Sequence, residues 1–331
     1  MKTTSVMIQS LCVPCCNRCR YCLLSWNGTV EGAAWDRSVR TAERFIHELK
    51  ARRPDLPVSF SFGYAMEHPD LKGALRTLRR LGSPTAEFLQ CDGMRMRSDA
   101  QCSELMQTLL VEGVKRLNFT VYGLSDYHDR FAGRNGDYAL IFRMMSAAKA
   151  AGLPFTAGIP LTAENLHEVD ALAELLKEAG SEKVFMTVPH EEGRGKLLSA
   201  VRIDLRGFAC LAPETRRLLN RTVFRTEGEW LSEPPQDTRR TILISLRKDN
   251  IAAYEAQSAL QALRETEALD ERYYAAFPRF DALAEAYGDP GGDKLYRFRD
   301  LFHHYRRQYA RTHDIRVYDV TDERQSGSRR Y

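Results

Sequence analysis

The sequence predicts a parallel α/β fold, and two patterns in the first 190 residues lead to this prediction. Short apolar runs rich in β-forming residues alternate with longer segments that have helical periodicity. The runs are apolar almost throughout, which is typical of strands covered on both faces. Such an order gives a parallel sheet with right-handed crossovers, as a closed or partly closed barrel or as a doubly wound open sheet. The predicted strands span residues 6–13, 58–63, 86–91, 116–123, 154–161 and 183–189.

Five helices are predicted between these strands. In the first, residues 36–53, the apolar side chains recur on one helical face. Three of the helices are followed by a glycine where a C-cap belongs, and Asp36, Ser98 and Asp137 are suitable N-caps. The other four helices span residues 71–81, 98–110, 138–151 and 166–179.

The pattern changes near residue 195, and this point divides the chain into a barrel, residues 1–195, and a mainly helical extension, residues 196–331. We expect the extension to cap the barrel or to shape the substrate site. Its aromatic residues recur at helical spacing, which favours a core stripe over a stacking surface. The extension contains a candidate strand at residues 241–246 and predicted helices at 251–269, 271–287 and 293–312.

Composition excludes several classes of protein. The chain has 331 residues, and its formal net charge of +4 is too balanced to indicate nucleic-acid binding. No apolar run approaches the roughly 18 residues that a membrane span needs. The N-terminal residues lack the pattern of a secretory signal peptide, so we expect a cytoplasmic, reducing setting.

Five of the eight cysteines lie between positions 12 and 22, directly after the first predicted strand. Clustered thiols in a reducing compartment bind metal more often than they form disulfides. Cys15, Cys19 and Cys22 have the spacing of three ligands to an iron–sulfur cluster, and three ligands leave one iron open. Cys12 and Cys16 are expected to be bystanders. A zinc site completed by a distant histidine and a chance grouping are the alternatives.

The motif Cys15-x-x-x-Cys19-x-x-Cys22, with Tyr21 before the last cysteine and a strand before the loop, resembles the radical S-adenosylmethionine (radical SAM) superfamily. The resemblance covers about residues 4–195. It implies a partial (β/α)6 barrel of the TIM type, followed here by the helical extension, and a [4Fe-4S] cluster whose open iron binds S-adenosylmethionine. It also implies an external electron donor that is flavodoxin-like or ferredoxin-like.

The resemblance also implies contacts to S-adenosylmethionine at particular positions. Gly63 and Tyr64 occupy the place of the family's Gly-Gly-Glu-Pro motif, which is degenerate here and lacks the acid. Asn118 and Thr120 alternate on the fourth strand toward the ribose or the substrate. Similar contacts are expected from Tyr21 beside the cluster, from Gly158 and Val188 at the adenine, and from Arg194 in a Gly-Arg-Gly turn.

The expected function is that of an enzyme that cleaves S-adenosylmethionine reductively and abstracts hydrogen from a substrate. The substrate class stays open between a small metabolite and a peptide or protein, and no peptide-recognition domain is visible to favour the second. No catalytic acid or base is identified. The alternative is a non-catalytic iron–sulfur or zinc protein that uses its cysteines for structure or sensing.

Overall fold

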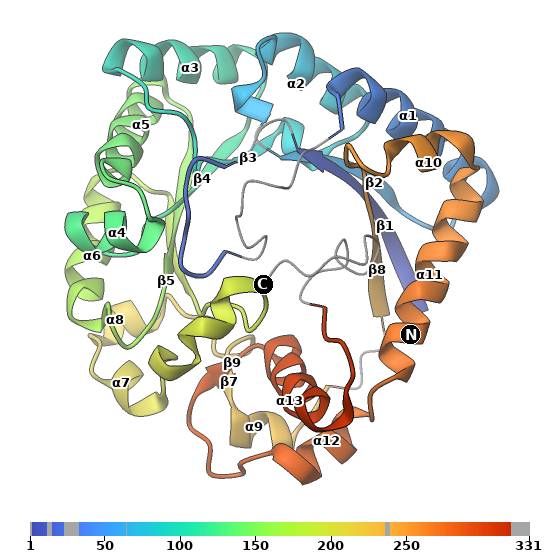
Figure 1. Ribbon diagram of the computed structural model, residues 1–331. Helices are drawn as coiled ribbons and strands as arrows, with labels where there is room; N and C mark the ends of the chain where they lie inside the picture. The colour runs from blue at the N-terminus through green and yellow to red at the C-terminus, as the bar shows by residue number, and fades with distance from the viewer. Residues whose placement is uncertain (1, 12–14, 23–32, 64, 236–238, 319–331) are drawn as a thin grey trace.

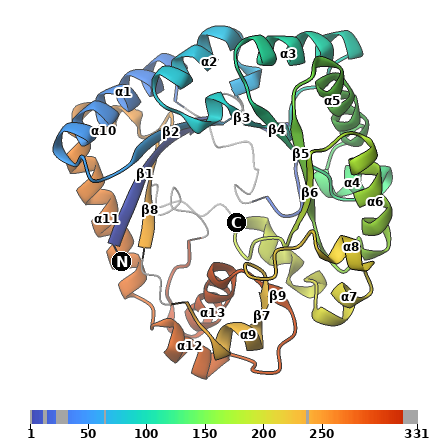
Figure 2. The same cartoon turned by 180° about the vertical axis from the view of Figure 1, so that it is seen from behind.

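A computed structural model describes residues 2–11, 15–22, 33–63, 65–235 and 239–318 (Figure 1). Its parallel strands curve round a common centre with helices outside them, and the view from behind shows the same arrangement (Figure 2). One sheet has the order β2-β1-β8 and the other the order β3-β4-β5-β6. The strands are β1 (Lys2–Leu11), β2 (Val58–Gly63), β3 (Phe88–Gln90), β4 (Arg116–Thr120), β5 (Phe155–Pro160), β6 (Lys183–Thr187) and β8 (Arg239–Ser245).

Every pair within these two sheets is parallel. Among the residues that the structure describes, no ladder joins β2 to β3 or β6 to β8, so the barrel is partial. The predicted α/β fold is confirmed. The strand at β8 extends the six-stranded prediction, because it pairs with β1 in the register Val6 opposite Ile242.

The five predicted helices are present, with ends within two residues of the expected positions. They are α1 (Trp35–Arg52), α2 (Leu71–Arg80), α3 (Asp99–Val111), α5 (Asp137–Ala151) and α6 (Leu166–Glu178). Helix α4 (Ser125–Ala132) was not predicted, and it ends at Gly133 in the left-handed conformation. Two short 3-10 turns, η1 (Ala65–Glu67) and η2 (Pro84–Ala86), flank α2.

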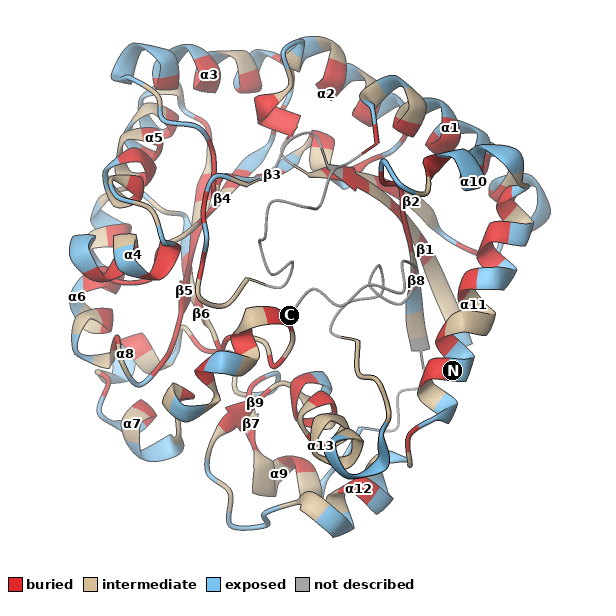
Figure 3. Cartoon of the chain, in the orientation of Figure 1, coloured by how far each residue is buried: buried red, intermediate tan, exposed pale blue. Residues whose placement is uncertain are grey.

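The strands have two different faces. Side chains that point to the helices, such as Leu117, Phe119 and Phe155, are fully buried in an apolar core. Those on the opposite, inner face are mostly half-buried (Figure 3), as Ser5, Met7 and Gln9 of β1 show. The polar inner face therefore borders the space that the strands surround.

The region 251–269 forms two helices instead of the one predicted. Helix α10 (Ile251–Ala256) ends at Gln257, which has extended backbone, and Ser258 then caps α11 (Ala259–Ala275). The carboxylate of Glu48 in α1 accepts a hydrogen bond of 2.8 Å from the amide of Ala259. This contact holds the start of α11 against α1, beside the sheet edge that β8 completes.

The remaining elements lie in the sector between β6 and β8 in both views (Figures 1 and 2). Strands β7 and β9 pair antiparallel. Trp230, Leu301 and Tyr305 form an apolar core of their own, with Phe298 and Phe302 packed against it, as the aromatic stripe predicted. These elements are η3 (Gly193–Val201), α7 (Leu205–Ala209), α8 (Pro213–Arg216), β7 (Arg225–Thr226), α9 (Glu227–Ser232), α12 (Phe280–Tyr287), β9 (Leu295–Tyr296) and α13 (Phe298–His313).

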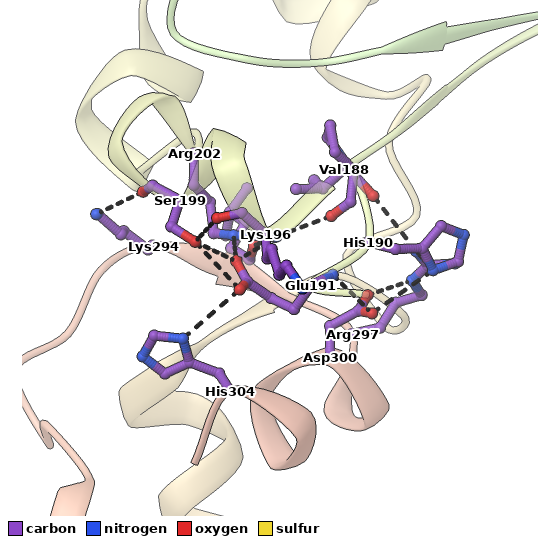
Figure 4. A network of polar contacts seen from close by, with 12 residues as sticks. Val188, His190, Glu191, Lys196, Ser199, Arg202, Lys294, Arg297, Asp300 and His304 are labelled. Atoms are coloured by element: carbon purple, nitrogen blue, oxygen red, sulfur yellow. Dashed lines mark hydrogen bonds and ion pairs between the residues drawn. The ribbon is translucent and has the colours of Figure 1, made fainter. Parts of the chain in front are cut away.

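A buried polar network joins this sector to the end of β6 (Figure 4). Glu191 and Arg202 are 0 % and 4 % exposed and form an ion pair of 2.7 Å. Arg202 also donates to the carbonyls of Pro189 at 2.8 Å and Leu295 at 3.0 Å. From α13, Arg307 pairs with the Glu191 carboxylate, and Asp300 accepts from the Glu191 amide at 3.2 Å. The network therefore fixes α13 to the strand end that the sequence assigns to the cofactor.

Candidate active site

The cysteine loop lies at the carboxyl ends of the parallel strands, where active sites of such folds occur. Its backbone is held on three sides. The amide of Cys16 donates to the carbonyl of Gly93 after β3 at 2.8 Å, and the amide of Arg18 donates to the carbonyl of Ala132 in α4 at 2.7 Å. The carbonyl of Cys22 accepts from the amide of Arg194 after β6 at 3.0 Å.

Cys19 is the most deeply buried of the loop thiols that the structure describes. It is 9 % exposed, and its Sγ lies 3.1 Å from the hydroxyl of Tyr122. Burial raises the pKa of this thiol, the hydrogen bond with Tyr122 opposes that effect, and the charges of Cys15, Asp92 and Cys22 add to it. The three loop cysteines therefore lie close enough to act on one another, and a bound cation would favour the thiolate that burial disfavours.

Two glycines leave room for the loop. Gly93 has φ +65°, and a Cβ built on it would lie 2.0 Å from Sγ of Cys15. Gly133 also has φ +65°, and its Cβ would lie 3.0 Å from the Cβ and the carbonyl oxygen of Arg18. Both positions combine a left-handed backbone with a close approach, so they require glycine.

A buried hydrogen-bond network of Asn17, Asp137 and His128 supports the cysteine loop. Asn17, which is 2 % exposed, donates to the carboxylate of Asp137 at 2.8 Å, and His128 Nε2 donates to the same oxygen at 3.1 Å. The His128 Nδ1 accepts from the amide of Tyr122 at 3.2 Å, which fixes the tautomer with the proton on Nε2. Because both ring nitrogens are engaged, His128 holds the Asp137 carboxylate that binds Asn17 of the loop.

The other predicted cofactor residues lie in two places. Tyr21 packs on Tyr122 and Phe131, with ring centroids 5.5 and 5.7 Å away, beside Cys19. The guanidinium of Arg194 donates to the carbonyl of Arg18 at 3.0 Å, which ties the Gly-Arg-Gly turn to the loop. Both residues therefore belong to the surroundings of the cysteines.

The remaining predicted cofactor residues lie on the strands or directly after them. Asn118 and Thr120 are on the inner face of β4, and Gly158 is on β5, where a Cβ would lie 2.9 Å from the ring of Phe185. Val188 is 1 % exposed and its side chain belongs to the apolar core. Gly63 ends β2, opposite Leu11. Tyr64 lies outside the described residues, as does Cys12, the expected bystander. The cofactor contacts assigned to Tyr64 and to the strand residues stay predictions.

Sequence reasoning missed Asp92, which follows β3 and precedes Gly93. Its carboxylate accepts from the Thr120 amide at 2.8 Å, from the Thr120 hydroxyl at 2.7 Å, and from Gln90. Burial raises the pKa of Asp92 to about 6, although these hydrogen bonds act in the opposite direction. The only available signal was its place at a strand end, beside a glycine, in a fold that puts chemistry there.

The fold and the loop define a partial parallel barrel with a cysteine-rich site at the carboxyl ends of its strands. A family model described as the Radical SAM superfamily matches residues 11–192, more than half of the chain. The chain therefore belongs to the radical SAM superfamily, a class of enzymes that use an iron–sulfur cluster and S-adenosylmethionine. The resemblance seen in the sequence is confirmed.

Solved structures of the same superfamily are similar at low identity. Streptococcus suis SuiB bound to the precursor peptide SuiA is 12 % identical with a TM-score of 0.47, covering 72 % of this chain and 58 % of that one. Coproporphyrinogen III oxidase (HemN) from Escherichia coli is 13 % identical with a TM-score of 0.43, covering 74 % and 63 %. This chain thus spans less than two thirds of the length of either protein. No curated protein sequence matches it.

The described residues lack two kinds of feature. None of the helices there combines the length and the apolar character that crossing a membrane requires. Over the same residues, no three His, Cys, Asp or Glu side chains are grouped tightly enough to hold a single metal ion.

Proposed function

We propose that the chain binds a [4Fe-4S] cluster through Cys15, Cys19 and Cys22 and uses it to cleave S-adenosylmethionine reductively. The observation that carries the proposal is the support of the loop. The short segment that carries the three cysteines is held at Cys16, Arg18 and Cys22 by the ends of β3 and α4 and by the turn after β6. Gly93 makes room for the Cys15 thiol. The donor set is the one that iron–sulfur clusters take.

When bound, a reduced cluster supplies the electron that splits S-adenosylmethionine and so generates the radical that removes hydrogen from a substrate. The residues of this chain keep the site dry for that chemistry. Tyr122, Tyr127 and Phe131 pack round Cys19 in a small apolar cluster, with Tyr21 and Cys22 against it. Asn118 and Thr120 are proposed to orient the bound cofactor from the inner face of β4, and Gly63, Tyr64, Gly158, Val188 and Arg194 to complete its contacts.

The electron donor is proposed to be an external flavodoxin-like or ferredoxin-like protein. The substrate is a small molecule or a peptide. A cytoplasmic setting is proposed from the cysteine usage, since the described cysteines are all free thiols.

The test is cofactor cleavage by the full chain. Protein loaded anaerobically with iron and sulfide, then given dithionite and S-adenosylmethionine, should release 5′-deoxyadenosine, measured by chromatography. Cys19→Ala should lose bound iron and the product. Cys16→Ala is the matched control, because Cys16 lies in the same loop but is exposed, and it should retain both. Full iron loading without any product would refute the enzyme and leave a structural or sensing cluster.

A further inference from the structure

A cavity of about 530 Å³ lies on the inner face of the four-stranded sheet β3-β4-β5-β6. It is lined in part by Phe88, Arg116 and Lys183, the first residues of β3, β4 and β6, so it occupies the amino-terminal half of that face. The cysteine loop lies at the opposite, carboxyl ends of the strands. Sites for small molecules have volumes of roughly 300 to 1,000 Å³, so the cavity is large enough to be one.

The floor of the cavity is one layer of polar side chains, which lie opposite one another on the four strands. In strand register this layer consists of Gln90, Asn118, Thr156 and Lys183. The Thr156 hydroxyl donates to Asn118 Oδ1 at 2.7 Å, and Asn118 Nδ2 donates to Gln90 Oε1 at 2.6 Å. These hydrogen bonds fix the orientation of both amide groups before a ligand binds, which lowers the entropic cost of binding.

The amino end of the cavity is positively charged. Lys183 and Arg116 are both exposed there, and none of the described residues that line the cavity is acidic. Arg116 pairs with Glu182 at 3.4 Å, but each of these two side chains is about half exposed, so water screens the pair. The acid beyond the polar layer is Asp92, which accepts from Gln90 on the side of the cysteine loop. The cavity therefore favours an anionic group at its amino end.

The cavity also has aromatic walls. Phe185 follows Lys183 on the inner face of β6 and lies opposite Gly158 of β5. A Cβ on Gly158 would lie 2.9 Å from the ring of Phe185, so the glycine lets that ring reach over β5. At the other side of the cavity, the ring of Phe88 is 50 % exposed. Accessible aromatic rings beside fixed polar groups are typical of sites that bind ring systems.

We propose that this cavity binds the substrate, and that the substrate is a small anionic molecule with a ring system. Its carboxylate or phosphate lies against Lys183 and Arg116, and the ring system packs on Phe185. The cavity adjoins Asn118 and Thr120, which are proposed to contact the cofactor. Thr120 is four residues beyond Arg116 on β4, so a molecule that extends about 13 Å from the anionic group reaches the layer next to the cysteine loop. The assignment rests on the proposed function and narrows its substrate class.

The test is equilibrium dialysis of cluster-loaded full-length protein, without reductant, against three probes that share one ring system. 2-Naphthoate and 2-naphthyl phosphate are anions, and 2-naphthamide is the neutral counterpart of the carboxylate. Lys183→Gln removes the positive charge, Lys183→Arg keeps it, and Phe185→Leu removes the aromatic ring. Lys177→Gln is the control, because Lys177 lies on α6 outside the cavity and pairs with Glu174 at 2.6 Å, and it should bind all three probes as wild type does.

Wild type should bind the anions more tightly than 2-naphthamide, and the anion that binds more tightly indicates the charged group of the substrate. Lys183→Gln should bind both anions about tenfold more weakly, the loss expected for one charge-assisted hydrogen bond at an exposed position. Its affinity for 2-naphthamide should stay within about twofold of wild type, because that probe has no charge to lose a partner. Lys183→Arg should restore anion binding, and Phe185→Leu should weaken all three probes by about threefold.

Two results would overturn the inference. One is anion binding that Lys183→Gln leaves equal to wild type, and Lys183 is exposed, so this variant should fold. The other is displacement of 2-naphthoate by S-adenosylmethionine, which would assign the cavity to the cofactor, whereas binding of both together supports a separate substrate site. If loaded wild type binds the anions as expected but fails to bind S-adenosylmethionine, the error lies in the proposed function and not in the anion site.

Discussion

Replacing Glu191 by glutamine removes one charge from the network that joins α13 to the end of β6 (Figure 4). The amide keeps the shape of the side chain, but it leaves Arg202 and Arg307 without their shared counter-charge. The side chains of these arginines are 1 % and 15 % exposed, so solvent compensates little of the loss. We therefore expect a large effect on the free energy of unfolding.

The magnitude follows from the pKa of the carboxyl. Burial raises the pKa of Glu191, but the interaction with His304 and the charges of Arg202 and Arg307 outweigh burial and lower the pKa from 4.5 to about 2. A carboxyl shifted in this way stabilises the folded state by about 3 kcal/mol above both values. Because the folded pKa is depressed, the contribution is complete above pH 4.5 and is lost as the pH falls toward 2.

The assay is urea unfolding of cluster-free protein followed by tryptophan fluorescence. At pH 7, Glu191→Gln should lose about 3 kcal/mol, and the difference from wild type should be about halved near pH 3. Glu233→Gln is the control, because Glu233 pairs with Arg225 at 2.9 Å but is 79 % exposed, and it should lose no more than about 0.5 kcal/mol. A loss for Glu191→Gln as small as that of the control, or one independent of pH, would refute the reasoning.

Two further predictions concern the loop. Gly93→Ala should lose bound iron because the new Cβ displaces the Cys15 thiol. Gly82→Ala is the control, because Gly82 has φ +69° with nothing within 4 Å of its Cβ, and it should keep the iron. Equal iron content in the two variants would contradict the clash. Tyr122→Phe should keep the cluster but make its reduction potential more negative, because the substitution removes the hydrogen bond to Cys19. The potential is measured by spectroelectrochemistry. An unchanged or higher potential would show that the Tyr122 hydroxyl does not act on the cluster.

Local patterns predicted most of the barrel. The strands and helices up to residue 187 follow from apolar runs and helical periodicity, which local sequence specifies. The break between α10 and α11 within residues 251–269 could also have been predicted, because serine is a common N-cap. Ser258 caps α11 by accepting a hydrogen bond from the amide of Gln261 at 3.1 Å. Helix α4 was missed because it has only eight residues, although its buried side chains at 127, 128, 131 and 132 recur at helical spacing.

The parts that sequence did not predict depend on distant residues. The sequence near residues 239–245 does not indicate that β8 pairs with β1. Asp92 carries no motif, and its partner Thr120 comes from the next strand, 28 positions later. The lack of an ion pair of Asp92 among the described residues is a property of the folded neighbourhood. The three cysteines could be predicted from the sequence because they lie in one short segment. The glycines that make room for the loop, Gly93 and Gly133, lie on other elements.

The pairing of β8 with β1 has a consequence for biogenesis. Ser5 and Thr241, which hydrogen-bond across these strands at 2.7 Å, are 236 residues apart in the chain. During synthesis, β1 therefore leaves the ribosome with one edge that stays open until most of the polypeptide has been made. An open strand edge favours association with other chains. The cysteines follow directly after β1 in the sequence. Cluster insertion is therefore expected to follow the synthesis of β8, which closes that edge.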